Sequence, residues 1–110
     1  MRLPNGRRAV IDQQKIVEYC LSPEHDEGKH KATLFHDLLG LTLQDAPRLH
    51  AALRQAAAHG EALPGIGDRY GQRYVIDFEM TGPGRRAVVR SAWIVCTGEV
   101  VPRLVTCYIM

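Results

Sequence analysis

"RYGQRYVIDFEMTGPGRRAVVRSAWIVC", residues 69–96, decides the fold, because its apolar side chains alternate with polar ones. A period of two is typical of a strand that buries one face. In the first half, the residues that share one face are Tyr70, Tyr74, Ile76 and Phe78, and those on the other face are Arg69, Arg73 and Asp77. In the second half, Ala87, Val89, Ser91 and Trp93 alternate with Val88, Arg90 and Ala92. The intervening "TGPG" predicts a turn, so the two halves form a hairpin.

On the C-terminal side, "TGEV" predicts another turn, and "VVPRLVTCYIM" (residues 100–110) supplies a last strand. On the N-terminal side the apolar period changes from two to about 3.6. One helix is expected behind the N-cap Asp12, a second between Gly28 and Gly40, and a third that ends at Gly60. Thr42 and Asp45 resemble a capping box for the third helix, whose regular part begins nearer Asp45 because of Pro47.

Two further segments complete the prediction: residues 8–11 as a short edge strand, and "GEALPGIGD" (residues 60–68) as a glycine- and proline-rich connection. Helices first and strands afterwards predict an α+β fold. We expect a single domain over residues 1–110, with a helical half (1–60) and a sheet half (68–110). In it, two to three N-terminal helices pack on a C-terminal antiparallel β-meander of three to four strands.

Composition excludes several classes of protein. The apolar share of 45% and charged share of 24% are those of a globular domain, and the net charge of +2 is too small to mark a dedicated nucleic-acid binder. No apolar run is long enough for a membrane span or a signal peptide, which predicts a cytoplasmic protein with no membrane contact. The three cysteines have no paired spacing and are expected to be reduced.

Arginines dominate the C-terminal half, where acidic residues are sparse, and their planar forks suit phosphate groups. The alternative is that they are ordinary solvent-facing strand residues. Arg103 and Thr106 belong to the last strand, where strict alternation puts them on opposite faces unless a bulge near Pro102 reconciles them. Tyr70 and Tyr74 could stack on bases or pack in the core.

"SPEHDEGKHKATLF", residues 22–35, gathers the groups best able to move a proton near neutral pH, including His25 and His30. Lys29 and Lys31 fall in the first turn of the second helix, where the helix dipole favours a bound phosphate and disfavours lysine. The alternative is a solvated helix start whose Asp26 and Glu27 balance the lysines. A metal site on the two histidines and one of those acids is the weaker option, because the spacing matches no standard motif.

Several stretches together resemble a bacterial domain family of unknown function whose members are similar to the C-terminal toxin modules of polymorphic-toxin proteins. They are "LSPEHDEGKHKATLFHDLLGLT", "YGQRY", "AWIV" and "PRLVTCYI", and the resemblance runs from Leu3 to Ile109. Such modules are similar to the barnase, EndoU, colicin and RelE-like ribonucleases, in which helices precede an antiparallel sheet of about four strands.

The resemblance implies a metal-independent endoribonuclease that needs no cofactor. The matching polar positions, expected to be catalytic, are His25, Lys31, Arg103 and Thr106. The expected substrate-binding residues are Lys29, His30, Tyr70 and Arg90. RNA and a small antitoxin or immunity-type protein are the expected partners.

The alternative function is a non-enzymatic module of the same fold that binds a small partner protein or RNA. It is favoured by the absence of a complete catalytic motif and by the apolar last strand, whose edge a homodimer or an antitoxin could cover.

Overall fold

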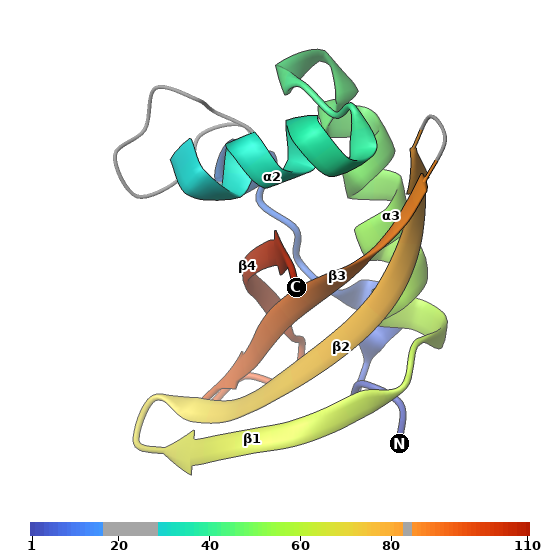
Figure 1. Ribbon diagram of the computed structural model, residues 1–110. Coiled ribbons are helices and arrows are strands. Elements are labelled where there is room, and N and C mark those ends of the chain that lie inside the picture. Colours follow the sequence, from blue (N-terminus) through green and yellow to red (C-terminus); the bar gives the residue numbers. More distant parts are fainter. Residues whose placement is uncertain (17–28, 83–84) are drawn as a thin grey trace.

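A computed structural model describes residues 1–16, 29–82 and 85–110, and the side chains of residues 29–33 are not described. The helices are η1 (Gly6–Arg8), α1 (Gln13–Lys15), α2 (Lys29–Leu39), η3 (Leu43–Asp45) and α3 (Ala46–His59). The strands are β1 (Ala62–Asp68), β2 (Gly71–Gly82), β3 (Arg85–Cys96) and β4 (Arg103–Ile109). The four strands form one antiparallel sheet in the order β1-β2-β3-β4, so the predicted α+β fold with a C-terminal meander is confirmed (Figure 1).

The first strand of the sheet is the main difference from the sequence interpretation. Residues 60–68 were expected to be a connection, but β1 pairs with β2 from Ala62 opposite Ile76 to Asp68 opposite Gly71. The ladder is irregular between Pro64 and Gly67. Proline and glycine are tolerated here because β1 is an edge strand, which needs hydrogen bonds on one side only.

The expected edge strand over residues 8–11 is also wrong. Arg8 ends the 3-10 helix η1, and Val10 alone forms a parallel bridge, to Arg103. The Val10 N–H donates to the Pro102 carbonyl and the Leu104 N–H donates to the Val10 carbonyl, each over 2.9 Å. The chain then leaves β4, because Asp12 caps α1 by accepting a hydrogen bond from the Gln14 N–H. The remainder of the expected first helix, residues 17–21, lies outside the described residues.

The capping box at Thr42 and Asp45 is confirmed, since the Asp45 carboxylate accepts from the Thr42 N–H over 2.8 Å. It opens η3, and α3 follows at Ala46 with Pro47 in its first turn. Helix α2 ends at Leu39, where Gly40 takes a left-handed conformation with φ of 67°. These local signals set the helix ends as the sequence indicated.

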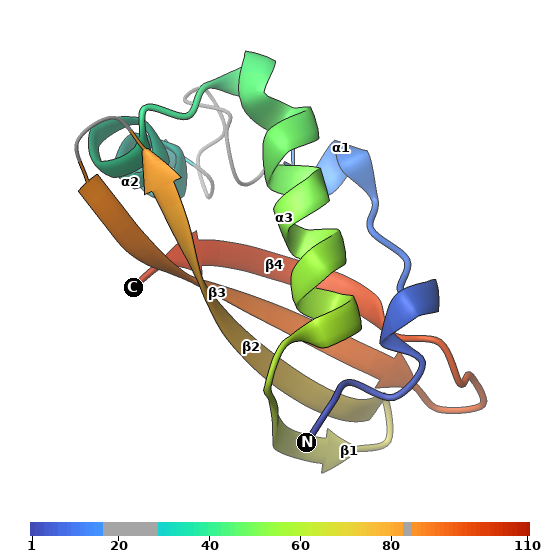
Figure 2. The ribbon, with the colours of Figure 1, turned by 90° about the vertical axis from the view of Figure 1, so that its right-hand side faces the viewer.

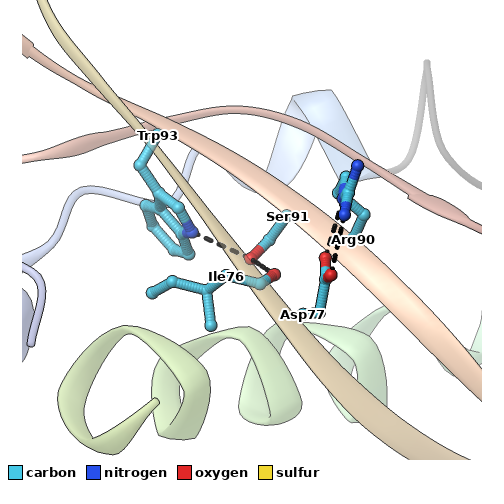
Figure 3. A network of polar contacts seen from close by, with 5 residues as sticks. All are labelled: Ile76, Asp77, Arg90, Ser91 and Trp93. Carbon is cyan, nitrogen blue, oxygen red and sulfur yellow. Dashed lines mark hydrogen bonds and ion pairs between the residues drawn. The ribbon is translucent and has the colours of Figure 1, made fainter. Parts of the chain in front are cut away.

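Helices α2 and α3 lie on the same side of the sheet and bury its inner face (Figure 2). The largest fully buried side chains include Trp93, Phe35, Leu39, Leu49 and Ile76. Trp93 donates from Nε1 to the Ser91 hydroxyl over 2.9 Å, and that hydroxyl donates to the Ile76 carbonyl over 2.8 Å (Figure 3). This chain satisfies the polar atoms that Ser91 and Trp93 bring into the core.

Replacing Gly6 with alanine is expected to destabilise the fold by about 1–3 kcal/mol, as overpacking does. A β-carbon at Gly6 would lie 1.8 Å from the Ala57 carbonyl oxygen, which belongs to the backbone of α3. Urea unfolding followed by circular dichroism measures the loss. Gly65→Ala is the control, because its β-carbon would meet nothing closer than 3.6 Å. Equal stability of the two variants would contradict the prediction.

Candidate functional site

The outer face of the sheet is the face turned away from α2 and α3, and it carries most of the predicted polar residues that the structure describes. The cross-strand register assigns its members. From β2 to β4, the three adjacent rows are Arg73–Ile94–Arg103, Val75–Ala92–Thr106 and Asp77–Arg90–Tyr108. Their side chains range from half-buried to exposed, whereas the alternate residues, such as Ile76 and Trp93, are buried.

A bulge in β4 determines which residues share this face. Thr106 pairs with Ala92, but Trp93 pairs with Leu104, so Val105 is an extra residue with no partner of its own in β3. Because of this extra residue, Arg103 and Thr106 lie on the same face, as the buried Leu104 and Cys107 confirm from the other side. The sequence interpretation allowed for such a bulge near Pro102, and the structure locates it at Val105.

Arg90 makes the most defined polar contact on the outer face. Its Nε and one terminal nitrogen donate to the two carboxylate oxygens of Asp77, both over 2.8 Å (Figure 3). Each of the two side chains is 33% exposed. The hydrogen bonds from Arg90 hold the pKa of Asp77 below its ordinary value. Asp77 in turn raises the pKa of Arg90, with a smaller contribution from Tyr108 on the other side.

Arg103 is held in the same way by a different acid. Its Nε and one terminal nitrogen donate to the carboxylate of Glu99, over 3.0 and 2.9 Å, from the first residue of β4 to the turn that precedes it. Arg103 lowers the pKa of Glu99, and Glu99 raises the pKa of Arg103, in each case chiefly through these hydrogen bonds. Both outer-face arginines that the sequence singled out are therefore oriented by bidentate carboxylates.

The remaining predicted residues lie elsewhere. Tyr70 is not in a strand with Tyr74 but in the turn between β1 and β2, where it is 58% exposed. Arg69 contacts it, with a terminal nitrogen 2.8 Å from the Tyr70 hydroxyl and the guanidinium 4.9 Å from the ring centre. Because Tyr70 lies in the turn that ends before Gly71, it is removed from the alternation that the sequence suggested.

The predicted residues of the loop and of α2 are only partly described. Lys29, His30 and Lys31 form the first turn of α2, and their side chains are not described; His25 lies outside the described residues. Helix α2 packs against β4 and lies next to the C-terminal end of that strand (Figures 1 and 2). Arg103 begins the strand and Ile109 ends it six steps later, which corresponds to about 20 Å at ~3.3 Å per residue. The structure thus groups Arg90, Arg103 and Thr106, with α2 at one end of the strand that carries two of them.

Sequence reasoning did not select Asp77 and Glu99 as functional residues. Alternation placed Asp77 opposite the apolar face of its strand, but the register that makes it the neighbour of Arg90 could not be read from the sequence. Glu99 and Arg103 are four residues apart, but that spacing brings side chains together in a helix and not in a loop and strand, so it gave no signal for their pair.

Two kinds of feature are absent from the described part of the chain. No cluster of three or more histidine, cysteine, aspartate or glutamate side chains there is arranged to hold a metal ion. Over the same residues, no helix has the length and hydropathy needed to cross a bilayer.

The Asp77–Arg90 pair predicts a specific pH dependence. Because the pKa of Asp77 is lowered in the folded protein, the pair stabilises the fold above the unfolded-state pKa of about 3.9 and loses this effect as pH falls through the folded pKa. The stability difference between wild type and Asp77→Asn should therefore be constant from pH 7 to about 5 and shrink below about 4. Urea unfolding across this pH range measures the difference. In a protein that already carries Arg90→Gln, the stability change caused by Asp77→Asn should no longer depend on pH. If it still does, a group other than the Asp77–Arg90 pair causes the pH dependence.

A solved structure shares this fold. A chain of the solved structure titled "Contact-dependent growth inhibition toxin - immunity protein complex from Klebsiella pneumoniae 342" superimposes with a TM-score of 0.68 and 17% sequence identity. The match covers 92% of this chain and 99% of that chain, and at such low identity it shows the fold alone. A search of curated proteins found no match. Residues 2–110 match the family described as "Domain of unknown function (DUF6883)", and the protein belongs to this family.

Proposed function

We propose that the chain is a toxin-type domain that cleaves RNA without a metal ion, using the outer face of its sheet. The observation that carries this proposal is the bulge at Val105, which sets Arg103 and Thr106 on the same face as Arg90. Bulges are common next to active sites, where they redirect a side chain. Two further supports are the resemblance of the sequence to polymorphic-toxin modules and the fold shared with a chain of a toxin–immunity complex.

The chemistry follows from these residue types. The ribose 2′-oxygen attacks the adjacent phosphorus and expels the 5′-oxygen, which requires a base, an acid and positive charge at the phosphorane. His25 serves as the general base or acid, and Arg103 stabilises the phosphorane. The Thr106 hydroxyl donates a hydrogen bond to a phosphate oxygen. No step requires a cofactor.

Cleavage of purified total RNA in the presence of EDTA tests the proposal. We expect EDTA-resistant fragments that end in 2′,3′-cyclic phosphates, and a rate about 10²-fold lower for Arg103→Gln. Arg2→Gln is the matched control, because Arg2 is exposed and contacts the end of α3 through the Ala58 carbonyl. Intact RNA after incubation with wild type would overturn the proposal, and loss of cleavage with EDTA would point to a metal-dependent enzyme.

A second candidate function is a module that binds an immunity-type or antitoxin protein without catalysis. One observation favours it: β1 exposes Leu63 at 58% and Ile66 at 70% on an edge of the sheet. Exposed apolar edges are commonly covered by a partner. Either function is compatible with a protein partner of the kind named in the toxin–immunity complex. Intact RNA together with a stable complex with the product of a neighbouring gene would favour this candidate.

A further inference from the structure

We propose that Arg90 and Arg103 form a two-point clamp that binds two separate backbone phosphates of one RNA strand lying across the outer face. The inference rests on the proposed function and adds to it the length and path of the RNA that binds. It is carried by the matching geometry of the two arginine–carboxylate pairs and by their separation in the sheet.

Each arginine is held side-on by its carboxylate. In both pairs the donors are Nε and one terminal nitrogen, and the acceptors are both oxygens of Asp77 or Glu99. A guanidinium has a second edge, formed by its two terminal nitrogens, which points away from a carboxylate bound side-on. That edge has the geometry to bind a phosphate bidentately. Asp77 and Glu99 are thus positioning residues, which reduce the rotational freedom each arginine would lose on binding.

The distance between the two guanidinium groups, which we call the forks, is set by the register of β3 and β4. Arg103 lies opposite Ile94, and Arg90 lies four residues before Ile94 on β3, which separates the two arginines by about 13 Å along the strand. A single phosphate is too small to contact both arginines, so a ligand that bridges them must present two phosphates that are more than one nucleotide apart. The clamp therefore requires an oligonucleotide rather than a mononucleotide.

The surface between the forks suits a strand of RNA. Ala92 and Thr106 form the row between the row of Arg90 and the row of Arg103, and their short side chains leave room for an RNA backbone to pass. Thr106 thus lies in the row between those of the two arginines. Arg103, Thr106 and Arg90 therefore follow one another along the outer face, in an order that suits an extended RNA strand.

Binding of 2′-O-methyl oligouridylates of increasing length, which resist cleavage, tests the clamp by fluorescence anisotropy. For wild type we expect affinity to rise steeply at the length that first reaches both forks, because the second contact becomes intramolecular. Arg90→Gln and Arg103→Gln should each lower the affinity of the longer oligomers about tenfold. Each should also reduce the slope of log affinity against log salt by about 0.7. The dinucleotide, which has one phosphate, should lose no more than about twofold in either variant, since it can bind at the other fork.

Controls separate the clamp from charge and from folding. Arg2 is an exposed residue that contacts the end of α3. Arg2→Gln removes the same charge as the clamp variants and should leave the dependence of affinity on oligomer length unchanged. Arg90→Lys keeps the charge but lacks the fork, so it should lose the affinity step while keeping most of the salt slope. Thermal unfolding of each variant identifies any that is not folded.

The outcomes distinguish the clamp from the proposed function. If one variant weakens all lengths equally and the other has no effect, the clamp is overturned, while RNA cleavage by wild type would still support the enzyme. If wild type binds no oligomer of any length, the clamp is overturned, and cleavage of total RNA decides the function separately. Length-dependent losses in both variants support the clamp.

Discussion

Trp93→Ala is expected to lower the free energy of unfolding by about 3–5 kcal/mol, the largest stability effect that we predict for a single substitution in this chain. Trp93 has no exposed surface and is the largest of the fully buried side chains. Its removal loses apolar burial, leaves a cavity beneath β3 and deprives the Ser91 hydroxyl of its donor. For a marginally stable domain, this loss is a large part of the total stability.

Urea unfolding followed by circular dichroism is the appropriate measurement, because Trp93 is the single tryptophan and its removal abolishes the usual fluorescence signal. Trp93→Phe keeps most of the apolar volume and should cost clearly less. Tyr70→Ala is the surface control, with an expected change within about 0.5 kcal/mol. A loss below about 1 kcal/mol for Trp93→Ala would show that the core repacks around the missing indole.

His25→Ala is expected to reduce RNA cleavage by about 10²–10⁴-fold while the protein stays folded, since this is the contribution of one positioned acid or base. The reason is chemical: among the polar positions that match the toxin modules, His25 is the only histidine, and histidine is the side chain best suited to acid–base catalysis near neutral pH. Cleavage of labelled RNA and growth arrest on induced expression are the two measurements.

The other histidines supply the controls. His50 and His59 lie on α3, which packs against the inner face of the sheet. The variants His50→Ala and His59→Ala should therefore retain RNA cleavage. His30→Ala should have a smaller effect than His25→Ala, because the resemblance implies a catalytic role for His25 and only a substrate-binding role for His30. Equal toxicity of His25→Ala and wild type would remove this histidine from the mechanism.

Much of the fold could be predicted from local patterns. The alternation in residues 69–96 assigned Ile76 and Trp93 to the buried face, and the capping box at Thr42 and Asp45 located the start of the third helix. The match to a domain family of unknown function confirmed that part of the predicted resemblance. The prediction failed at β1, whose glycines and proline have low strand propensity and whose extended conformation comes from pairing with β2.

The candidate site was less predictable, because its residues come together through contacts distant in sequence. Arg90 and Thr106 were named from the sequence, but their common face depended on a register that no local pattern contains. The partner of Arg90 is 13 residues away on another strand. Even for Glu99 and Arg103, which are four residues apart, the contact depends on the path of the loop before β4, so the sequence did not indicate it.

By itself, the sequence determined that helices precede a C-terminal antiparallel meander, and it determined the buried side of β2 and β3 and the ends of α2 and α3. Each of these depends on side-chain periodicity and on hydrogen bonds between residues close in the chain. Only the tertiary structure decided that residues 62–68 form a strand, that Val105 is the bulged residue, and that Arg90 and Arg103 are oriented by carboxylates on one face. Strand pairing is a choice among partners far apart in sequence, and shifting it by one residue exchanges the two faces of a strand. For this protein, that choice set the candidate site.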